Sequence, residues 1–121
     1  MDALGLRLVR SILSDRDFST LAKAGVTEDA LFDDSRKAYQ WIAEYLRDTG
    51  DWPTCHMVEE NLGIDLPDEP EPLRYTVDLV RKRSLGKRIE SRLTDAANLL
   101  GEQDPDEALK ILSETALDLR V

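Results

Sequence analysis

Residues 73–100 read LRYTVDLVRKRSLGKRIESRLTDAANLL, and this stretch decides the fold. Its apolar residues step by 4, 4, 3 and 4 positions, through Leu85, Ile89, Leu93, Ala96 and Leu100. That spacing is typical of a helix whose apolar stripe packs against another helix. We therefore expect one long helix over 73–100, with Gly86 as a weak point near its middle. At ~1.5 Å per residue this helix spans roughly 42 Å, more than the ~30 Å that suits a small domain, so part of it should project.

The residues after this helix predict a second arm. Gly101 ends the first helix, and Asp104 and Pro105 supply the N-cap and the first helical residue of another. Its apolar residues repeat at steps of 3, 4 and 3, at Leu109, Leu112, Ala116 and Leu119. Because the connecting turn is short, the two arms should form an antiparallel helical hairpin over 73–121. The chain has no convincing stretch of alternating apolar and polar residues, so we expect an all-α protein without a sheet.

The residues before the long helix predict a linker and a helical head. Residues 64–72, IDLPDEPEP, hold three of the five prolines and four acidic residues, which neither a helix nor a central strand tolerates. We interpret them as a proline-rich acidic linker that follows a head over residues 1–63. In the head, apolar spacing and turn residues predict two helices before Gly25, a long helix ending at Gly50 and a short helix capped by Thr54. Head, linker and hairpin are expected to make one domain.

Length and composition exclude several classes of protein. With 121 residues the chain is too short for a RecA-type motor core or a barrel enzyme, because these need well over ~200 residues. Its 16 basic and 25 acidic residues give a formal charge of -9, which repels DNA phosphate and anionic lipid. The single cysteine, Cys55, fits a reducing compartment. No signal-peptide pattern or membrane-length apolar run is visible, so we expect a cytoplasmic protein with no membrane contact.

Charge is unevenly distributed along the hairpin. Residues 73–100 carry 7 basic and 3 acidic side chains, whereas residues 101–121 carry 2 and 6. Two interpretations stay open. The arms could complement each other electrostatically, or the basic cluster could face an acidic partner surface, a subunit of its own kind included. The cluster consists of Arg81, Lys82, Arg83, Lys87 and Arg88.

The residues offer little for catalysis or ligand binding. His56 adjoins Cys55 on the short predicted helix, where neighbours lie ~100° apart and cannot chelate one ion together. Helix capping or solvated faces explain paired carboxylates such as Asp33 and Asp34. Residues 86–88, Gly-Lys-Arg, lie inside a predicted helix and lack the preceding strand and glycine of a phosphate-binding loop. We therefore expect no catalytic residue, no metal site and no cofactor in this chain.

Three segments in order give the chain a family resemblance. They are LVRSILSDRDF (8–18), EDALFDDSRKAYQWIAEYLRDTGDWPTCHMVEENLG (28–63) and YTVDLVRKRSLGKRIESRLTDAANLL (75–100). They are similar to the N-terminal domain of replicative DNA helicases of the DnaB type, found in bacteria and their phages. The resemblance covers nearly the whole chain, although each motif is mainly apolar spacing. Between Leu62 and Tyr75 the family usually has a glycine-rich turn and a further helix, and their absence here favours a divergent, phage-encoded member.

The resemblance implies a small globular head followed by a projecting antiparallel helical hairpin. In the family such domains pair and build the collar of a hexameric ring, which receives primase in the primosome, while loader proteins act on the same helicase. For this chain it implies a homo-oligomer with little direct DNA binding and no catalysis. ATP and Mg are expected only in a separate motor domain. The chain stops at Val121 without a helix stop signal, and we interpret it as a fragment of an ATP-dependent DNA helicase.

We expect the contact surface for self-association, primase or loader to lie on the hairpin. The second arm is too short to cover the first, so apolar residues near the start of the long helix are left to pack on the head or on another chain. Three alternatives stay open: a helicase-binding helical domain of a primase, a stand-alone acidic phage protein that imitates DNA or blocks a host factor, and an enzyme of unknown type. The expected interface consists of Leu73, Val77, Val80, Arg83, Arg88, Ile89, Leu93, Leu109, Leu112, Ala116 and Leu119.

Overall fold

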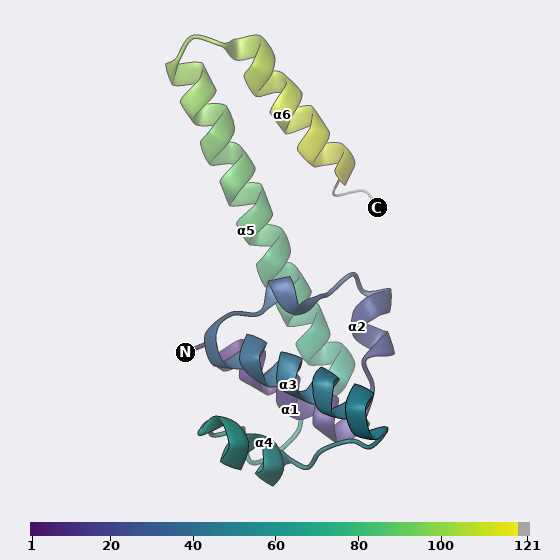
Figure 1. Cartoon of the computed structure of the whole chain (residues 1–121). Helices are drawn as coiled ribbons and strands as arrows, with labels where there is room; N and C mark the ends of the chain where they lie inside the picture. The colour runs from purple at the N-terminus through teal and green to yellow at the C-terminus, as the bar shows by residue number, and fades with distance from the viewer. Residues whose placement is uncertain (119–121) are drawn as a thin grey trace. The chain divides into compact units, whose positions relative to one another are not determined.

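The computed structural model describes residues 1–118, with side chains described for residues 1–116. Within this part of the chain there are six α-helices, one short 3-10 helix (η1) and no strand (Figure 1). The prediction of an all-α fold is confirmed. The chain divides into two compact units, Met1–Arg81 and Lys82–Val121. We call the first unit the head and the described part of the second, residues 82–118, the hairpin unit.

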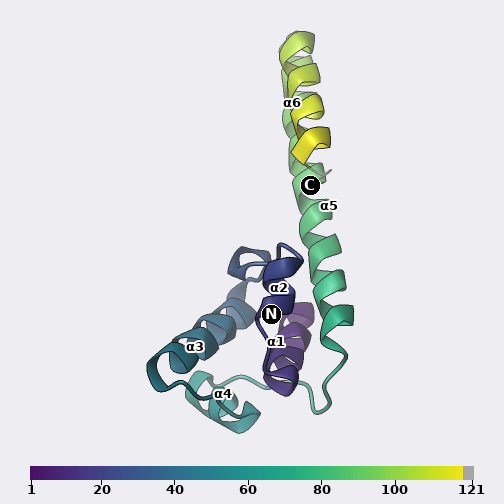
Figure 2. The same ribbon diagram turned by 90° about the vertical axis from the view of Figure 1, so that its right-hand side faces the viewer.

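Helix α1 (Ala3–Asp15) is the central element of the head. Its sequence is apolar on most of its circumference, and such a helix is stable only when it is covered on several sides. Accordingly, α1 contributes buried residues to two apolar clusters. In Figure 2, α1 lies between α3 (Asp33–Thr49) and the first turns of α5 (Leu73–Gly101).

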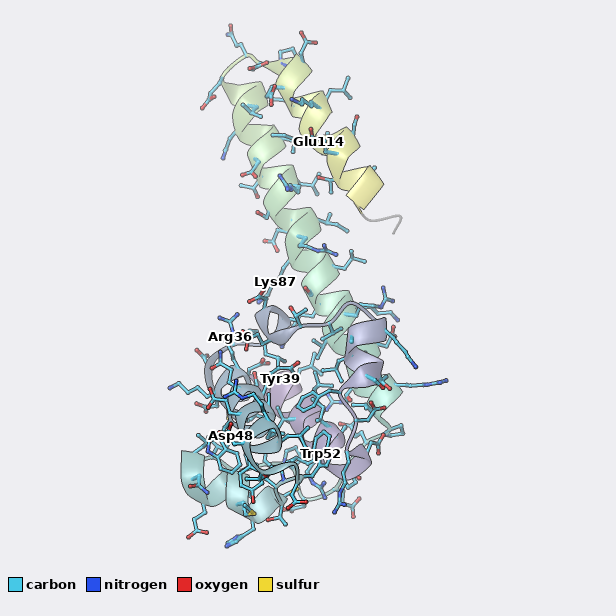
Figure 3. All side chains as sticks on the ribbon, turned by 45° about the vertical axis from the view of Figure 1, so that its right-hand side comes forward. Arg36, Tyr39, Asp48, Trp52, Lys87 and Glu114 are labelled. Carbon is cyan, nitrogen blue, oxygen red and sulfur yellow. The ribbon has the colours of Figure 1, made fainter. Side chains whose placement is uncertain are left out.

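The two clusters form the core of the head. Phe18 and Trp52 pack against both of them, and their rings stack with centroids 5.2 Å apart. Tyr39 meets the ring of Phe18 edge-on at 5.1 Å; Tyr39 and Trp52 are labelled in Figure 3. The first cluster comprises Leu8, Ile12, Leu21, Val26, Leu31, Leu73, Val77 and Val80. The second comprises Leu6, Val9, Leu13, Ala38, Ile42, Val58 and Leu66.

Short polar side chains fix where the helices of the head begin. Helix α2 (Ser19–Lys23) begins just after Asp17. The Asp17 carboxylate accepts hydrogen bonds from the backbone amides and the hydroxyls of Ser19 and Thr20. These bonds lower the pKa of Asp17 from 3.8 to about 2, because they favour the charged carboxylate. Thr27 caps η1 (Glu28–Ala30), and Thr54 caps α4 (Cys55–Leu62) through a 3.2 Å bond from the Met57 amide. The predicted cap at Thr54 is therefore confirmed.

A buried polar contact joins α1 to α3. The Asp2 carboxylate caps α1 by accepting a bond from the Gly5 amide at 3.0 Å, and it accepts a second bond from the Ser35 hydroxyl at 2.6 Å. Gly5 lies where the two helices meet, since a Cβ built on it would overlap both the Asp2 carboxylate and the Ser35 side chain. A glycine is thus required at this position by the close approach of its neighbours.

Residues 64–72 are not helical, as predicted, but they are fastened to the head. Leu66 is buried in the second cluster. The Arg10 Nε donates to the Pro67 carbonyl at 3.1 Å, and the guanidinium of Arg7 holds both carboxylate oxygens of Glu71, at 2.6 and 2.8 Å. This ion pair lowers the pKa of Glu71, because it stabilises the carboxylate. The segment is consequently part of the head and not a free spacer.

Helix α5 is one continuous helix of 29 residues, close to the expected 73–100. Its first turns belong to the head, because Leu73, Val77 and Val80 are buried in the first cluster. The boundary between the two units therefore lies within α5, after Arg81, and not at the proline-rich segment. Helix α6 (Pro105–Asp118) begins at the proline that the sequence predicted, and Asp104 caps it by accepting a bond from the Glu107 amide at 3.2 Å.

Candidate docking surface

Two alanines lie where α5 and α6 pack together. Ala96 of α5 is 3% exposed and Ala108 of α6 is 2% exposed. Half-buried residues continue this inner seam on both helices, with Ile89 and Leu99 on α5 and Ile111 and Thr115 on α6. Small side chains at the tightest point let two helix backbones approach each other. The predicted antiparallel hairpin is therefore present within residues 82–118, and Ala96 and Ala108 are its buried residues.

The large apolar side chains of the hairpin unit are mostly outside this seam. Leu93 is 54% exposed, Leu100 56%, Leu109 65% and Leu112 38%. Ala97 and Ala116 are exposed as well. Leucines of this exposure are ordinary when scattered singly, whereas several on one surface indicate a contact site. We call the set Leu93, Ala97, Leu100, Leu109, Leu112 and Ala116 the leucine face.

Helix geometry places these residues on one side of the hairpin. With 3.6 residues per turn, Leu93 and Leu100 are rotated from Ala96 by about 60° and about 40°. By the same rule Leu109 and Leu112 are rotated from Ala108 by about 100° and about 40°, in the same sense. Because the two helices run antiparallel, residues that are rotated in the same sense from the facing alanines lie on the same side of the pair. The leucines of α5 and α6 therefore share one surface.

The structure separates the expected interface residues into several groups. Leu93, Leu109, Leu112 and Ala116 are on the leucine face. Ile89 is half-buried near the inner seam, Arg83 is half-buried and Arg88 is exposed. Leu73, Val77 and Val80 are buried in the core of the head, so they are not available to another chain. Leu119 lies outside the described residues.

The predicted seam of the second arm differs by one residue from the observed one. Spacing placed Leu109, Leu112 and Ala116 against the first arm, but Ala108, Ile111 and Thr115 occupy that position. Both sets are spaced by 3 and 4, so spacing alone cannot choose between them. Ala108 is buried and Leu109 is 65% exposed, so the stripe of small residues faces α5, and small side chains there let the two helices approach more closely than leucines would. On α5, Leu93 and Leu100 were likewise expected in the seam and are exposed, and the contribution of Leu99 was missed.

Charge is segregated along the hairpin unit. Residues 82–88 contain four basic side chains and no acidic one, and residues 102–107 contain four acidic side chains and no basic one. We call the first stretch the basic end and the second, at the turn between the helices, the acidic tip. Lys87 marks the basic end in Figure 3. The members are Lys82, Arg83, Lys87 and Arg88, and Glu102, Asp104, Asp106 and Glu107.

The described residues offer no grouping that suggests bound metal. No three histidine, cysteine or acidic side chains among them could hold one ion. The His56 side chain is 86% exposed, and its Nε2 lies 3.5 Å from a carboxylate oxygen of Glu60 one helical turn away. Cys55 is half-buried on the same helix. In residues 1–118 no helix is long and apolar enough to span a bilayer.

Fold and surface define this chain as a small all-α protein whose helical hairpin carries an exposed leucine face. Comparisons with protein-family models, with curated proteins and with solved structures give no match.

Proposed function

We propose that this chain is a non-catalytic oligomerisation and partner-docking domain of a hexameric replicative DNA helicase of the DnaB type. The observation that carries the proposal is the leucine face, because a hairpin that served only the chain's own core would not leave four leucines in water. The resemblance of segments 8–18, 28–63 and 75–100 supports the choice of family. In this proposal the domain contributes to the ring collar, where primase or a loader docks.

The size of the leucine face suits a reversible contact. Burying a leucine side chain fully contributes ~1.5–3 kcal/mol. The four leucines are 38–65% exposed, so covering each one is worth about 1 kcal/mol. Two copies that cover each other gain about 8 kcal/mol before association costs of ~4–15 kcal/mol are subtracted. The isolated chain should thus associate weakly, and covalent connection to a ring-forming motor would strengthen the contact by raising its effective concentration.

In this proposal the chain itself neither hydrolyses ATP nor binds DNA. The chain supplies no phosphate-binding loop, so ATP and Mg belong to a motor domain elsewhere in the helicase. Its formal charge of -9 argues for protein partners in preference to DNA. We therefore expect the isolated chain to hydrolyse no ATP and to bind duplex DNA negligibly at physiological salt.

A binding experiment with purified proteins tests the function. The immobilised chain is offered, separately, the primase and the replicative helicase encoded by the same genome, and retention is measured by surface plasmon resonance. Retention of primase, and its loss when Leu109 and Leu112 are both replaced by serine, is the expected result. Retention of helicase without self-association would instead favour the primase-side domain. If neither protein is retained and the chain stays monomeric at several hundred micromolar, the proposal is wrong.

A further inference from the structure

We infer that residues 64–72 form a strap that opens separately from the core of the head, and that the Arg7–Glu71 ion pair is the latch that holds the strap closed across α1. The strap runs from α4 past α1 to α5 (Figure 2). Strap and latch lie wholly within the head, so they would operate whatever partner the hairpin unit binds.

The strap is not held by backbone hydrogen bonds of the kind that hold a helix. None of residues 64–72, all of which the structure describes, lies in a helix or a strand. Pro67, Pro70 and Pro72 have no backbone N–H to donate. Attachment therefore depends on side chains and on carbonyl oxygens. A segment attached in this way opens at a lower cost in free energy than the helices around it.

The first half of the strap is anchored mainly by burial. The Leu66 side chain is 7% exposed within the second cluster. The Leu66 amide donates to a carboxylate oxygen of Glu59 at 3.2 Å, and the Arg10 Nε donates to the Pro67 carbonyl at 3.1 Å. This half has both an apolar anchor and two polar ones.

The second half of the strap depends on one side chain. Residues 68–70 and Pro72 are exposed, whereas Glu71 between them is half-buried. Both carboxylate oxygens of Glu71 accept bonds from the Arg7 guanidinium, at 2.6 and 2.8 Å. Within residues 68–72, all described, this pair is the one polar contact with α1. Loss of the pair would therefore free this half from α1.

The latch also connects the strap to α5. Glu71 raises the pKa of Arg7 chiefly through their hydrogen bond, and the Tyr75 phenol on the first turn of α5 adds to the shift. The amides of Tyr75 and Thr76 donate to the Pro72 carbonyl at 3.0 and 3.3 Å. Because the last residue of the strap closes the first turn of α5, opening the strap loosens that turn. The following turns stay buried in the first cluster.

Native-state hydrogen exchange, followed by NMR, tests the latch. Glu71→Gln removes the charge of the latch, and Glu69→Gln is the matched control, since it makes the same change of charge at an exposed strap residue. Three amides report on opening, those of Leu66, Tyr75 and Thr76. In Glu71→Gln these reporter amides should exchange about tenfold faster than in the original chain. In Glu69→Gln their rates should be unchanged.

Core amides show whether the strap opens by itself. Ile12 on α1 and Ile42 on α3 are fully buried, and their amides should exchange equally fast in all three proteins. Equal acceleration of reporter and core amides in Glu71→Gln would mean that the pair stabilises the whole head and that the strap has no opening of its own.

Salt supplies a readout that needs no variant. The side chains of the latch are 37% and 32% exposed, so solvent ions can screen them. Raising the ionic strength from ~0.01 to ~1 M shortens the Debye length from ~30 to ~3 Å. This change should speed exchange of the reporter amides in the original chain, and the effect should disappear in Glu71→Gln. A salt effect of equal size in both proteins would contradict the latch.

Two further results would overturn the inference. If the reporter amides exchange equally fast in Glu71→Gln and Glu69→Gln, the ion pair is not the latch. If Tyr75 and Thr76 accelerate but Leu66 does not, the pair acts on the start of α5 alone and the strap does not open as one segment.

Discussion

Replacing Leu109 by serine should weaken self-association without unfolding the chain. Leu109 is 65% exposed, so covering its exposed part is worth ~1–2 kcal/mol, taking ~1.5–3 kcal/mol for a whole leucine. A two-fold contact contains this residue twice, which makes the expected loss about 2–4 kcal/mol. Because 1.4 kcal/mol corresponds to a factor of ten, Kd should rise roughly 30- to 700-fold.

Leu109→Ser should hardly change the free energy of unfolding of the monomer. The exposed side chain contributes little to the alanine seam, and substitutions at such surface sites usually change the free energy of unfolding by less than ~0.5 kcal/mol. Sedimentation velocity over a range of concentrations measures the association, and urea titration followed by circular dichroism measures the stability. Tyr75→Ser is a suitable control, since Tyr75 is 53% exposed, similar to the leucines, but lies on the part of α5 that belongs to the head.

Two results would contradict the reasoning. The first is a Kd for Leu109→Ser within a factor of three of the original value, because the leucine face would then contribute nothing measurable. The second is an equal loss of association in Tyr75→Ser, which would mean that any exposed apolar residue promotes contact and that the surface has no specificity.

Three further predictions concern stability. Gly5→Ala should destabilise the chain by about 1–3 kcal/mol in urea titration, since the added methyl group has no room between α1 and α3; an unchanged midpoint would contradict the observed close approach. Gly86→Ala should stabilise it by ~0.5–1 kcal/mol, because the methyl group meets no neighbour in mid-helix; hydrogen exchange of the surrounding α5 amides would report the effect. In the folded chain the pKa of Asp17 is lowered from 3.8 to about 2. The contribution of this carboxylate to the free energy of unfolding is therefore complete above the unfolded pKa and is lost as pH falls through the folded pKa. The stability difference between the original chain and Asp17→Ala should accordingly shrink as pH falls from 3.8 to about 2, and a difference independent of pH would refute this.

Local signals explain how much of the fold the sequence could predict. The expected and observed bounds of the long helix differ by one residue, and α6 begins at Pro105 as expected. Glycines at the ends of α3 and α4 have positive φ, 75° at Gly50 and 63° at Gly63, which is the conformation that made them good stop signals. Each of these features depends on a few neighbouring residues, and they can be recognised without knowledge of the tertiary structure.

Contacts between distant residues could not be predicted in this way. Asp2 and Ser35 are 33 positions apart, and their hydrogen bond exists only because α1 and α3 meet at Gly5. The prolines of residues 64–72 predicted the absence of a helix there, but they gave no sign that Arg7 would hold Glu71 across 64 positions. The same limit applies to the candidate surface, because two sets of α6 residues with identical spacing could each have faced α5.

The set of α6 residues that faces α5 bears on function. Rotating α6 by one residue would bring Leu109 and Leu112 toward α5 and turn Ala108 outward. The observed register of α6 instead leaves about 1 kcal/mol of possible burial unused at each of Leu109 and Leu112, roughly 2 kcal/mol in all. Small domains are stable by only ~5–15 kcal/mol, so this is a substantial fraction. A hairpin that works alone gains nothing from such a register, whereas a hairpin that meets a partner recovers the unused burial at the contact, and the alanines keep its two helices close enough to present one continuous surface.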